Sequence, residues 1–191
     1  MIGTAALPKP YRDLAAPDVP RMIREAVALY GTTEDPGAAN DPQIMAWARE
    51  TARHVKGYTA DSIPWCGLFA AVVAQRAGWE TEIPNNPLWA LNWLGFGSPV
   101  DQPALGDVLV WRRKGGGHVG FYVGEDATHY HCLGGNQGDA VSIVRLPKAP
   151  SQTGVGFRGA RRPPWRVAQP ATVRPIHRTA RGVVPNSEGL G

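Results

Sequence analysis

The segment PWCGLFAAVVAQRAG, residues 64–78, is apolar all around a helix until Gln75 and Arg76. A helix that is apolar on every face has to be covered on every face, so it belongs inside a domain. Gly78 is expected to end it. The chain has 191 residues, of which 43% are hydrophobic, enough for one core of this kind. We therefore expect one main domain built around this helix.

The rest of the chain predicts helices first and strands afterwards. The early helical segments have an Asp near the start and a proline in the first turn. Later come short β-branched and aromatic runs separated by turns rich in Gly and Asp, which is typical of antiparallel strands. This order predicts an α+β fold. The expected helices are 18–31, 41–54, 64–78 and 87–95, and the expected strands are 107–111, 118–124, 128–133 and 141–146.

We divide the chain into an N-terminal extension (1–17), the α+β domain (18–166) and a tail (167–191). The tail contains Pro, Arg and Thr but few large apolar groups, so it is expected to be disordered or ordered by a partner. Residues 151–191 carry seven arginines against Glu188, a net charge of +6, whereas the whole chain carries +4. Because the basic charge lies there, we expect no specific nucleic-acid partner for the folded part.

Neither a membrane span nor a signal peptide is expected. No stretch approaches the roughly 20 apolar residues that a span needs, and prolines interrupt the first residues where a signal peptide would have its apolar block.

Cys66 stands at the start of the buried helix, just after Pro64 and Trp65. The first turn of a helix offers unpaired N–H groups and the positive end of the dipole, which favour a thiolate. The same N–H groups can hold the oxyanion of a tetrahedral intermediate. The alternative is that Cys66 only fills the core, since free cysteine is among the most buried residue types.

A nucleophilic cysteine needs a base, and His118 begins a strand after three glycines in KGGGHVGFYVG. A hairpin turning at residues 125–127 would bring 133–136 back beside His118. Asn136 is therefore the first candidate to orient the imidazole. His131, expected across from Gly120, competes for that role. Asn136 could instead serve only to accept an unusual backbone angle in its glycine-rich turn.

A zinc site made from Cys66, His118, His129, His131 and Cys132 is disfavoured. Strand alternation puts His129 and His131 on one face and Cys132 on the other, so Cys132 is expected to pack in the core. We expect no metal and no cofactor.

Four segments taken together, NDPQIMAWARE, DSIPWCGLF, GDVLVWRRKGGGHVGFYVGED and YHCLGGNQGDAVSI, resemble a bacterial and prophage family of the papain-like superfamily. This family is related to the CHAP domains and to the NlpC-type cell-wall peptidases, and the resemblance covers about residues 20–165. CHAP-like members have Glu-x-Asn after the histidine strand, where this chain has Gly134, Gly135 and Asn136. NlpC-type members have Asp-Cys-Ser at the nucleophile, where this chain has Trp-Cys-Gly, and a histidine third residue that would correspond to His131.

The resemblance implies a papain-like cysteine hydrolase, with Cys66 as nucleophile and His118 as base, acting on amide bonds of peptidoglycan. The bond would be that of an N-acetylmuramoyl-L-alanine amidase or a peptide-crosslink endopeptidase, cleaved through a thioester. It implies action at the cell wall, as in an endolysin or a virion-borne enzyme. Trp65, Trp89 and Trp93 are candidates to line the substrate groove, although tryptophans in apolar helices are expected more often to pack in the core. The alternatives are a Cys-dependent acyltransferase and a non-catalytic phage component, bound to a tail or virion protein through the basic tail.

Overall fold

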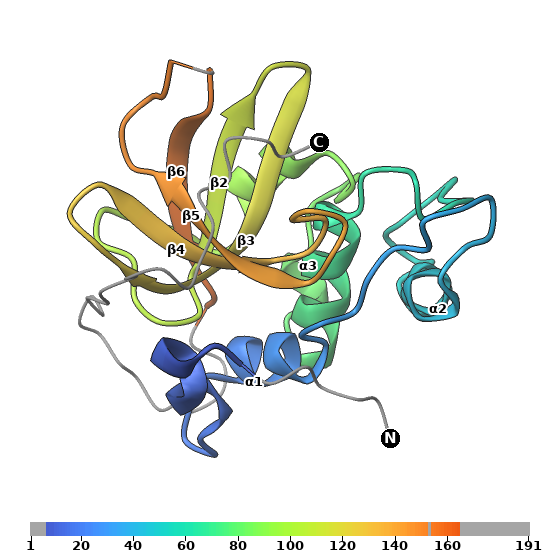
Figure 1. The fold of residues 1–191 in the computed structure, drawn as a ribbon, viewed down its shortest axis with the longest axis horizontal. Coiled ribbons are helices and arrows are strands. Elements are labelled where there is room, and N and C mark those ends of the chain that lie inside the picture. Colours follow the sequence, from blue (N-terminus) through green and yellow to red (C-terminus); the bar gives the residue numbers. More distant parts are fainter. Residues whose placement is uncertain (1–6, 153, 165–191) are drawn as a thin grey trace.

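The computed structural model describes residues 7–152 and 154–164, and the tail 167–191 lies outside them. An antiparallel sheet stands beside helices that gather on one side of it, with α3 against β3 and α2 outermost (Figure 1). The predicted α+β class is confirmed. The helices are η1 (Lys9–Ala15), α1 (Arg21–Ala28), α2 (Pro42–Glu50), α3 (Cys66–Arg76), η2 (Glu80–Glu82) and η3 (Ala90–Gly95). The strands are β1 (Ser98–Val100), β2 (Val108–Arg113), β3 (Gly116–Glu125), β4 (His129–Gly134), β5 (Ser142–Pro147) and β6 (Gly156–Arg162).

Helix α3 is the central helix that the sequence predicted. Its residues 66–74 are all buried, and Gly78 follows its end with a φ of 89°, in the left-handed region that favours glycine. Phe69 packs between Phe121 of β3 and Trp47 of α2, with ring centroids 5.9 and 6.1 Å apart. The first turn of α3 is thereby held between the sheet and the helical layer.

The sheet order is β1-β6-β2-β3-β4-β5, so the four predicted strands form the expected meander. Strand β6 was not predicted, because GFRGARR lacks an alternating apolar pattern. It pairs with β2 and is followed outward by the three-residue β1. Large side chains lie on both faces of the sheet, one set packed on the helices and the other around Trp111 and Tyr122.

The boundary expected at residue 17 differs from the structure. Tyr11 and Leu14 of η1 are buried in the same core as α3. The Tyr11 hydroxyl also lies 2.8 Å from Nδ1 of His131 on β4. Residues 9–15 therefore pack as part of the domain. The sequence did not predict η1 because its seven residues contain only two large apolar side chains, Tyr11 and Leu14, in a segment rich in proline.

In the described part of the chain, no helix is long and apolar enough to cross a membrane.

Candidate active site

Cys66 is the first residue of α3, and its sulfur lies against the sheet. Backbone N–H groups of Val119, Gly67 and Cys66 itself act on the sulfur as hydrogen-bond donors. Burial raises the pKa of the Cys66 thiol, whereas these N–H groups and the charge of Arg113 lower it. Burial has the larger effect, so the resting group is a thiol that requires a base. Val119 directly follows His118, which brings the start of α3 to the histidine segment of β3.

His118 is 1% exposed on β3. Burial lowers the pKa of His118 to about 4, a hydrogen bond with Gln137 acts in the opposite direction, and Arg113 lowers it further. The imidazole is therefore neutral at pH 7 and has a lone pair with which to accept a proton.

Gln137 is the side chain that orients this imidazole. Its Oε1 lies 2.9 Å from Nε2 of His118. Its Nε2 donates to the carbonyl oxygens of Cys132, at 3.3 Å, and Ser142, at 2.6 Å. Because two carbonyls fix the donor end of the amide, the acceptor end faces His118, and His118 must carry its proton on Nε2. The tautomer with a free lone pair on Nδ1 is thereby selected.

The side chain of Asn136, which was predicted to orient the His118 imidazole, makes a different contact. Its φ is 54°, and its Nδ2 donates to Oε2 of Glu34 at 3.4 Å. Asn is one of the few side chains that tolerate this left-handed backbone angle. The angle turns Asn136 aside and lets the next residue, Gln137, reach His118. The left-handed backbone angle that the alternative expected at Asn136 is present.

His131 is also away from the site. The observed pairing of β3 with β4 places it opposite Gly124 instead of Gly120. Six residues of strand separate Gly124 from His118, roughly 20 Å at ~3.3 Å per residue. The hairpin turns later than expected because Asp126 accepts the N–H groups of Thr128 and His129 and so starts the turn.

The His131 ring has its own partners there. Its Nδ1 faces the Tyr11 hydroxyl, and its Nε2 lies 2.9 Å from Oδ2 of Asp126. Arg145 donates to the same carboxylate oxygen at 2.7 Å. Although burial raises the pKa of Asp126, the bonds from Arg145 and His131 outweigh it and hold that pKa well below its usual range. This network fastens η1 to the β3–β4 hairpin.

Both cysteines are free thiols. Cys132 is fully buried in the apolar cluster around Trp111 and Tyr122, and burial raises its pKa. Among the described residues, no three His, Cys, Asp or Glu side chains are grouped closely enough to hold a metal ion.

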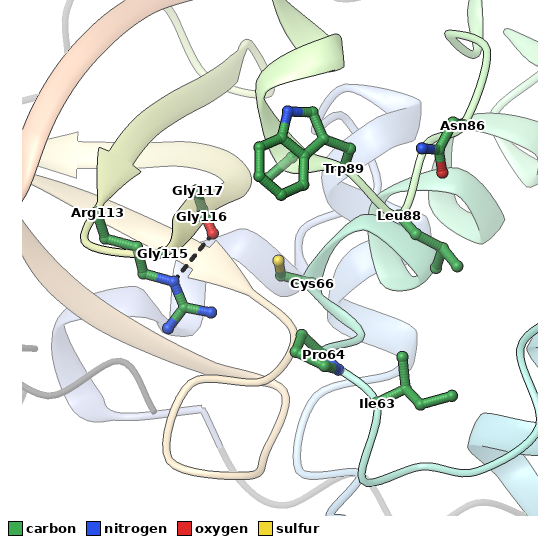
Figure 2. A pocket seen from close by; sticks show the side chains of 11 residues that line it. Ile63, Pro64, Cys66, Asn86, Leu88, Trp89, Arg113, Gly115, Gly116 and Gly117 are labelled. Carbon is green, nitrogen blue, oxygen red and sulfur yellow. Dashed lines mark hydrogen bonds between the residues drawn. The ribbon is translucent and has the colours of Figure 1, made fainter.

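A pocket of about 260 Å³ opens beside Cys66 (Figure 2). Its walls come from the loop before α3, the loop before η3 and the β2–β3 hairpin. Cys66 is only 3% exposed, and its sulfur faces the space between Trp89 and Arg113. The lining residues are Ile63, Pro64, Cys66, Asn86, Leu88, Trp89, Ala90, Arg113, Gly115, Gly116 and Gly117.

Of the three tryptophans suggested for the groove, only Trp89 lines this pocket, and it is 46% exposed. Trp65 and Trp93 are 0% exposed. Trp65 donates from Nε1 to Glu34 at 3.0 Å, and Trp93 donates to the Pro87 carbonyl at 3.0 Å. Both pack in the core.

Gly67 and Gly134 allow close packing around Cys66 and His118, respectively. A Cβ on Gly67 would lie 2.0 Å from the Pro87 carbonyl oxygen, which explains why glycine follows Cys66. A Cβ on Gly134 would lie 2.7 Å from Oε1 of Gln137 and 3.2 Å from Nε2 of His118. Gly134 thus lets the end of β4 pass close to the imidazole of His118.

Sequence reasoning missed Gln137 and Arg113. For Gln137 a signal was present: in GGNQ the residue suited to a left-handed turn is Asn, which leaves Gln to make the contact. For Arg113 we find no comparable signal.

No protein-family model matches the chain, and a search of curated proteins finds no match.

Proposed function

We propose that this protein is a papain-like cysteine hydrolase that cleaves amide bonds in bacterial peptidoglycan. The observation that carries the proposal is the buried, neutral imidazole of His118, which Gln137 holds in one tautomer, on the strand whose next residue, Val119, donates its backbone N–H to the Cys66 sulfur. The pocket at Cys66 supports it by offering a substrate access to the sulfur. The choice of peptidoglycan rests on the family resemblance of the sequence.

In the proposed reaction, Nδ1 of His118 takes the thiol proton as the Cys66 sulfur attacks the amide carbonyl. The tetrahedral oxyanion is held by backbone N–H groups at the start of α3. The C–N bond then breaks, His118 returns the proton to the leaving amine, and a thioester remains. Water, deprotonated by His118, attacks the thioester and releases the acid and the free thiol. Gln137 accepts the Nε2–H bond throughout and stabilises the imidazolium.

The test is a peptidoglycan digest analysed by mass spectrometry, with the wild type beside Cys66→Ala and Cys132→Ala. The wild type and Cys132→Ala are expected to release fragments, and the new termini identify the amide that is cut. Cys132 is the matched control because it is the other free thiol and lies outside the pocket. Equal digestion by Cys66→Ala would remove the nucleophile. No digestion by a folded wild type would favour the non-catalytic phage component.

The acyltransferase alternative shares every step up to the thioester. Repeating the digest with an added primary amine separates the two: a hydrolase yields free carboxyl termini, and a transferase yields amides of the added amine. We expect free carboxyl termini, in support of hydrolysis.

A further inference from the structure

We propose that Glu34 is a positioning residue for the nucleophile, which it holds by binding the side chain of Trp65, the residue before Cys66. The inference rests on the proposed function and adds to it a residue that takes no part in the chemical steps. It concerns the first turn of α3, whose N–H groups contact the sulfur. The proposed reaction requires that turn to stay in place, because the same N–H groups hold the oxyanion.

Helix α3 begins without a side-chain cap. Its N-cap residue is Trp65, and no side-chain hydrogen bond caps the first turn there. Tryptophan is not a capping residue, since Ser, Thr, Asp and Asn are the side chains that bond the free N–H groups of a first turn. The orientation of this turn therefore depends on how the Trp65 side chain is held.

The Trp65 ring is enclosed by apolar contacts and fixed by one polar atom. It is 0% exposed, and its centroid lies 6.0 Å from that of Trp47 on α2. A Cβ on Gly135 would lie 2.7 Å from Cζ3 of Trp65, so the loop after β4 passes against the ring as well. Apolar burial is non-directional and does not fix the tilt of a ring. The directional contact is the hydrogen bond from Nε1 of Trp65 to Oε2 of Glu34, at 3.0 Å.

Burial of an indole does not account for this hydrogen bond. Trp47 and Trp79 are also buried, and in the part of the chain that the structure describes their Nε1 atoms have no hydrogen-bond partner. Core packing of tryptophan in this protein therefore proceeds without a carboxylate. At Trp65 the acceptor is a carboxylate, which makes a hydrogen bond roughly twice as strong as a neutral acceptor does.

Glu34 lies on an anchored segment of backbone. Its N–H donates to the Asp139 carbonyl at 2.8 Å. The next N–H, that of Asp35, donates to Oδ2 of Asp61 at 3.1 Å, and Asp61 is 2% exposed in the loop before α3. These contacts fix Glu34 relative to the turn after β4 and to the loop that leads into α3. A carboxylate placed in this way holds Trp65 in one orientation.

The same carboxylate oxygen accepts a second hydrogen bond, from Nδ2 of Asn136 at 3.4 Å. That distance is beyond the usual range, whereas the 3.0 Å of the Trp65 bond lies within it. The positioning role is therefore assigned to the bond with Trp65. It follows that Asn136→Gly leaves Glu34 with its main partner.

Removing the Glu34 carboxylate should make Cys66 less reactive. The N–H groups of the first turn and of Val119 lower the pKa of the thiol, so a turn that is no longer fixed should raise this pKa. Two other effects would have the opposite sign. Loss of a negative charge alone would lower the pKa of the thiol, and a general loosening would expose a residue that is 3% exposed. Both would speed alkylation.

The test measures alkylation of Cys66 by iodoacetamide against pH in folded variants. Glu34→Met keeps the side-chain length and removes the acceptor, so alkylation at pH 7 should slow by about 10-fold, the effect of losing a hydrogen bond to a charged group, and its pH profile should shift to higher pH. Glu34→Gln keeps an acceptor and should restore most of the rate. The matched control is Asp35→Asn, because Asp35 is the adjacent carboxylate and its Oδ1 accepts from Gly37 within its own loop. It should react like the wild type.

Trp65→Phe tests the route of the effect, because it keeps an apolar ring and removes the Nε1–H donor. By itself it should slow alkylation about as much as Glu34→Met, and adding Glu34→Met to it should slow alkylation little further. The alkylation results stand even if the wild type digests no peptidoglycan and the proposed function fails. Where it does digest peptidoglycan, Glu34→Met should lower kcat and leave KM nearly unchanged.

Four outcomes overturn the inference. They are an unchanged or faster alkylation of Glu34→Met, equal slowing by Asp35→Asn, equal shifts of the pH profile in Glu34→Met and Glu34→Gln, and the same factor for Glu34→Met with Trp65 present or replaced.

Discussion

Replacing Gln137 by Met tests whether the amide beside His118 sets the chemistry of the site. The change removes the acceptor for the Nε2–H bond of 2.9 Å while keeping a side chain of similar length. His118 and Gln137 are 1% and 4% exposed, so water does not readily replace the lost partner. Leaving a buried donor unsatisfied costs about 1–3 kcal/mol. If that cost falls on the active tautomer, the rate drops about 5- to 150-fold.

The assay is alkylation of Cys66 by iodoacetamide, followed by mass spectrometry over a range of pH. It requires no substrate, and Cys132 serves as an internal reference because it is fully buried. Gln137→Met should slow alkylation near pH 7 by the factor above. Gln137→Glu keeps an acceptor and adds a negative charge, so it should raise the pKa of His118. The pH dependence of the alkylation rate should then shift to higher pH. A merely structural role for Gln137 would not produce that shift.

The control is Asn136→Gly, which removes the neighbouring amide while keeping a residue suited to the φ of 54°. It should leave the alkylation rate nearly unchanged. Equal slowing by Asn136→Gly and Gln137→Met, or no slowing by a folded Gln137→Met, would refute the assignment of Gln137 as the positioning residue.

Further changes test the packing and the electrostatics. Gly67→Ala places a Cβ 2.0 Å from a backbone oxygen, and this overpacking of about 1–3 kcal/mol should lower Tm by roughly 3–10 °C. The control Gly95→Ala, whose Cβ meets no atom within 4 Å, should have a Tm within about 2 °C of the wild type. The pKa of His118 is lower in the folded than in the unfolded state, so the free energy of unfolding should be unaffected by His118 above about pH 6.5 and should fall by on the order of 3 kcal/mol as the pH is lowered to 4. Urea titrations at several pH values should show that His118→Gln lacks this pH-dependent loss of stability. Tyr11→Phe removes the hydroxyl bonded to buried His131 and should lower the free energy of unfolding by about 1–3 kcal/mol, whereas an unchanged value would argue that η1 adds little to the domain.

Much of the fold could be read from local patterns. The fully apolar helix and the alternating runs after it predicted α3 and the four-stranded meander, because the hydrophobic periodicity of a short segment indicates both its secondary structure and its buried face. Strand β6 and helix η1 escaped prediction because their burial depends on distant partners. Strand β6, which is interrupted by glycine, is held by pairing with β2. Tyr11 of η1 is held by a hydrogen bond to His131, which is 120 residues away in the chain.

The sequence by itself determined the two reactive candidates. A cysteine at the start of a buried helix and a histidine at the start of a glycine-led strand are local signals. In the structure Cys66 begins α3 and lines the pocket, and His118 on β3 directly follows the pocket residue Gly117. Tertiary structure alone decided their companions. The left-handed backbone angle of Asn136 turns its side chain away and brings Gln137 to the imidazole, and a hairpin that turns later than predicted places His131 opposite Gly124, near the far end of β3. Such choices depend on backbone angles and on the closing of a hairpin, which adjacent amides and alternating histidines do not specify.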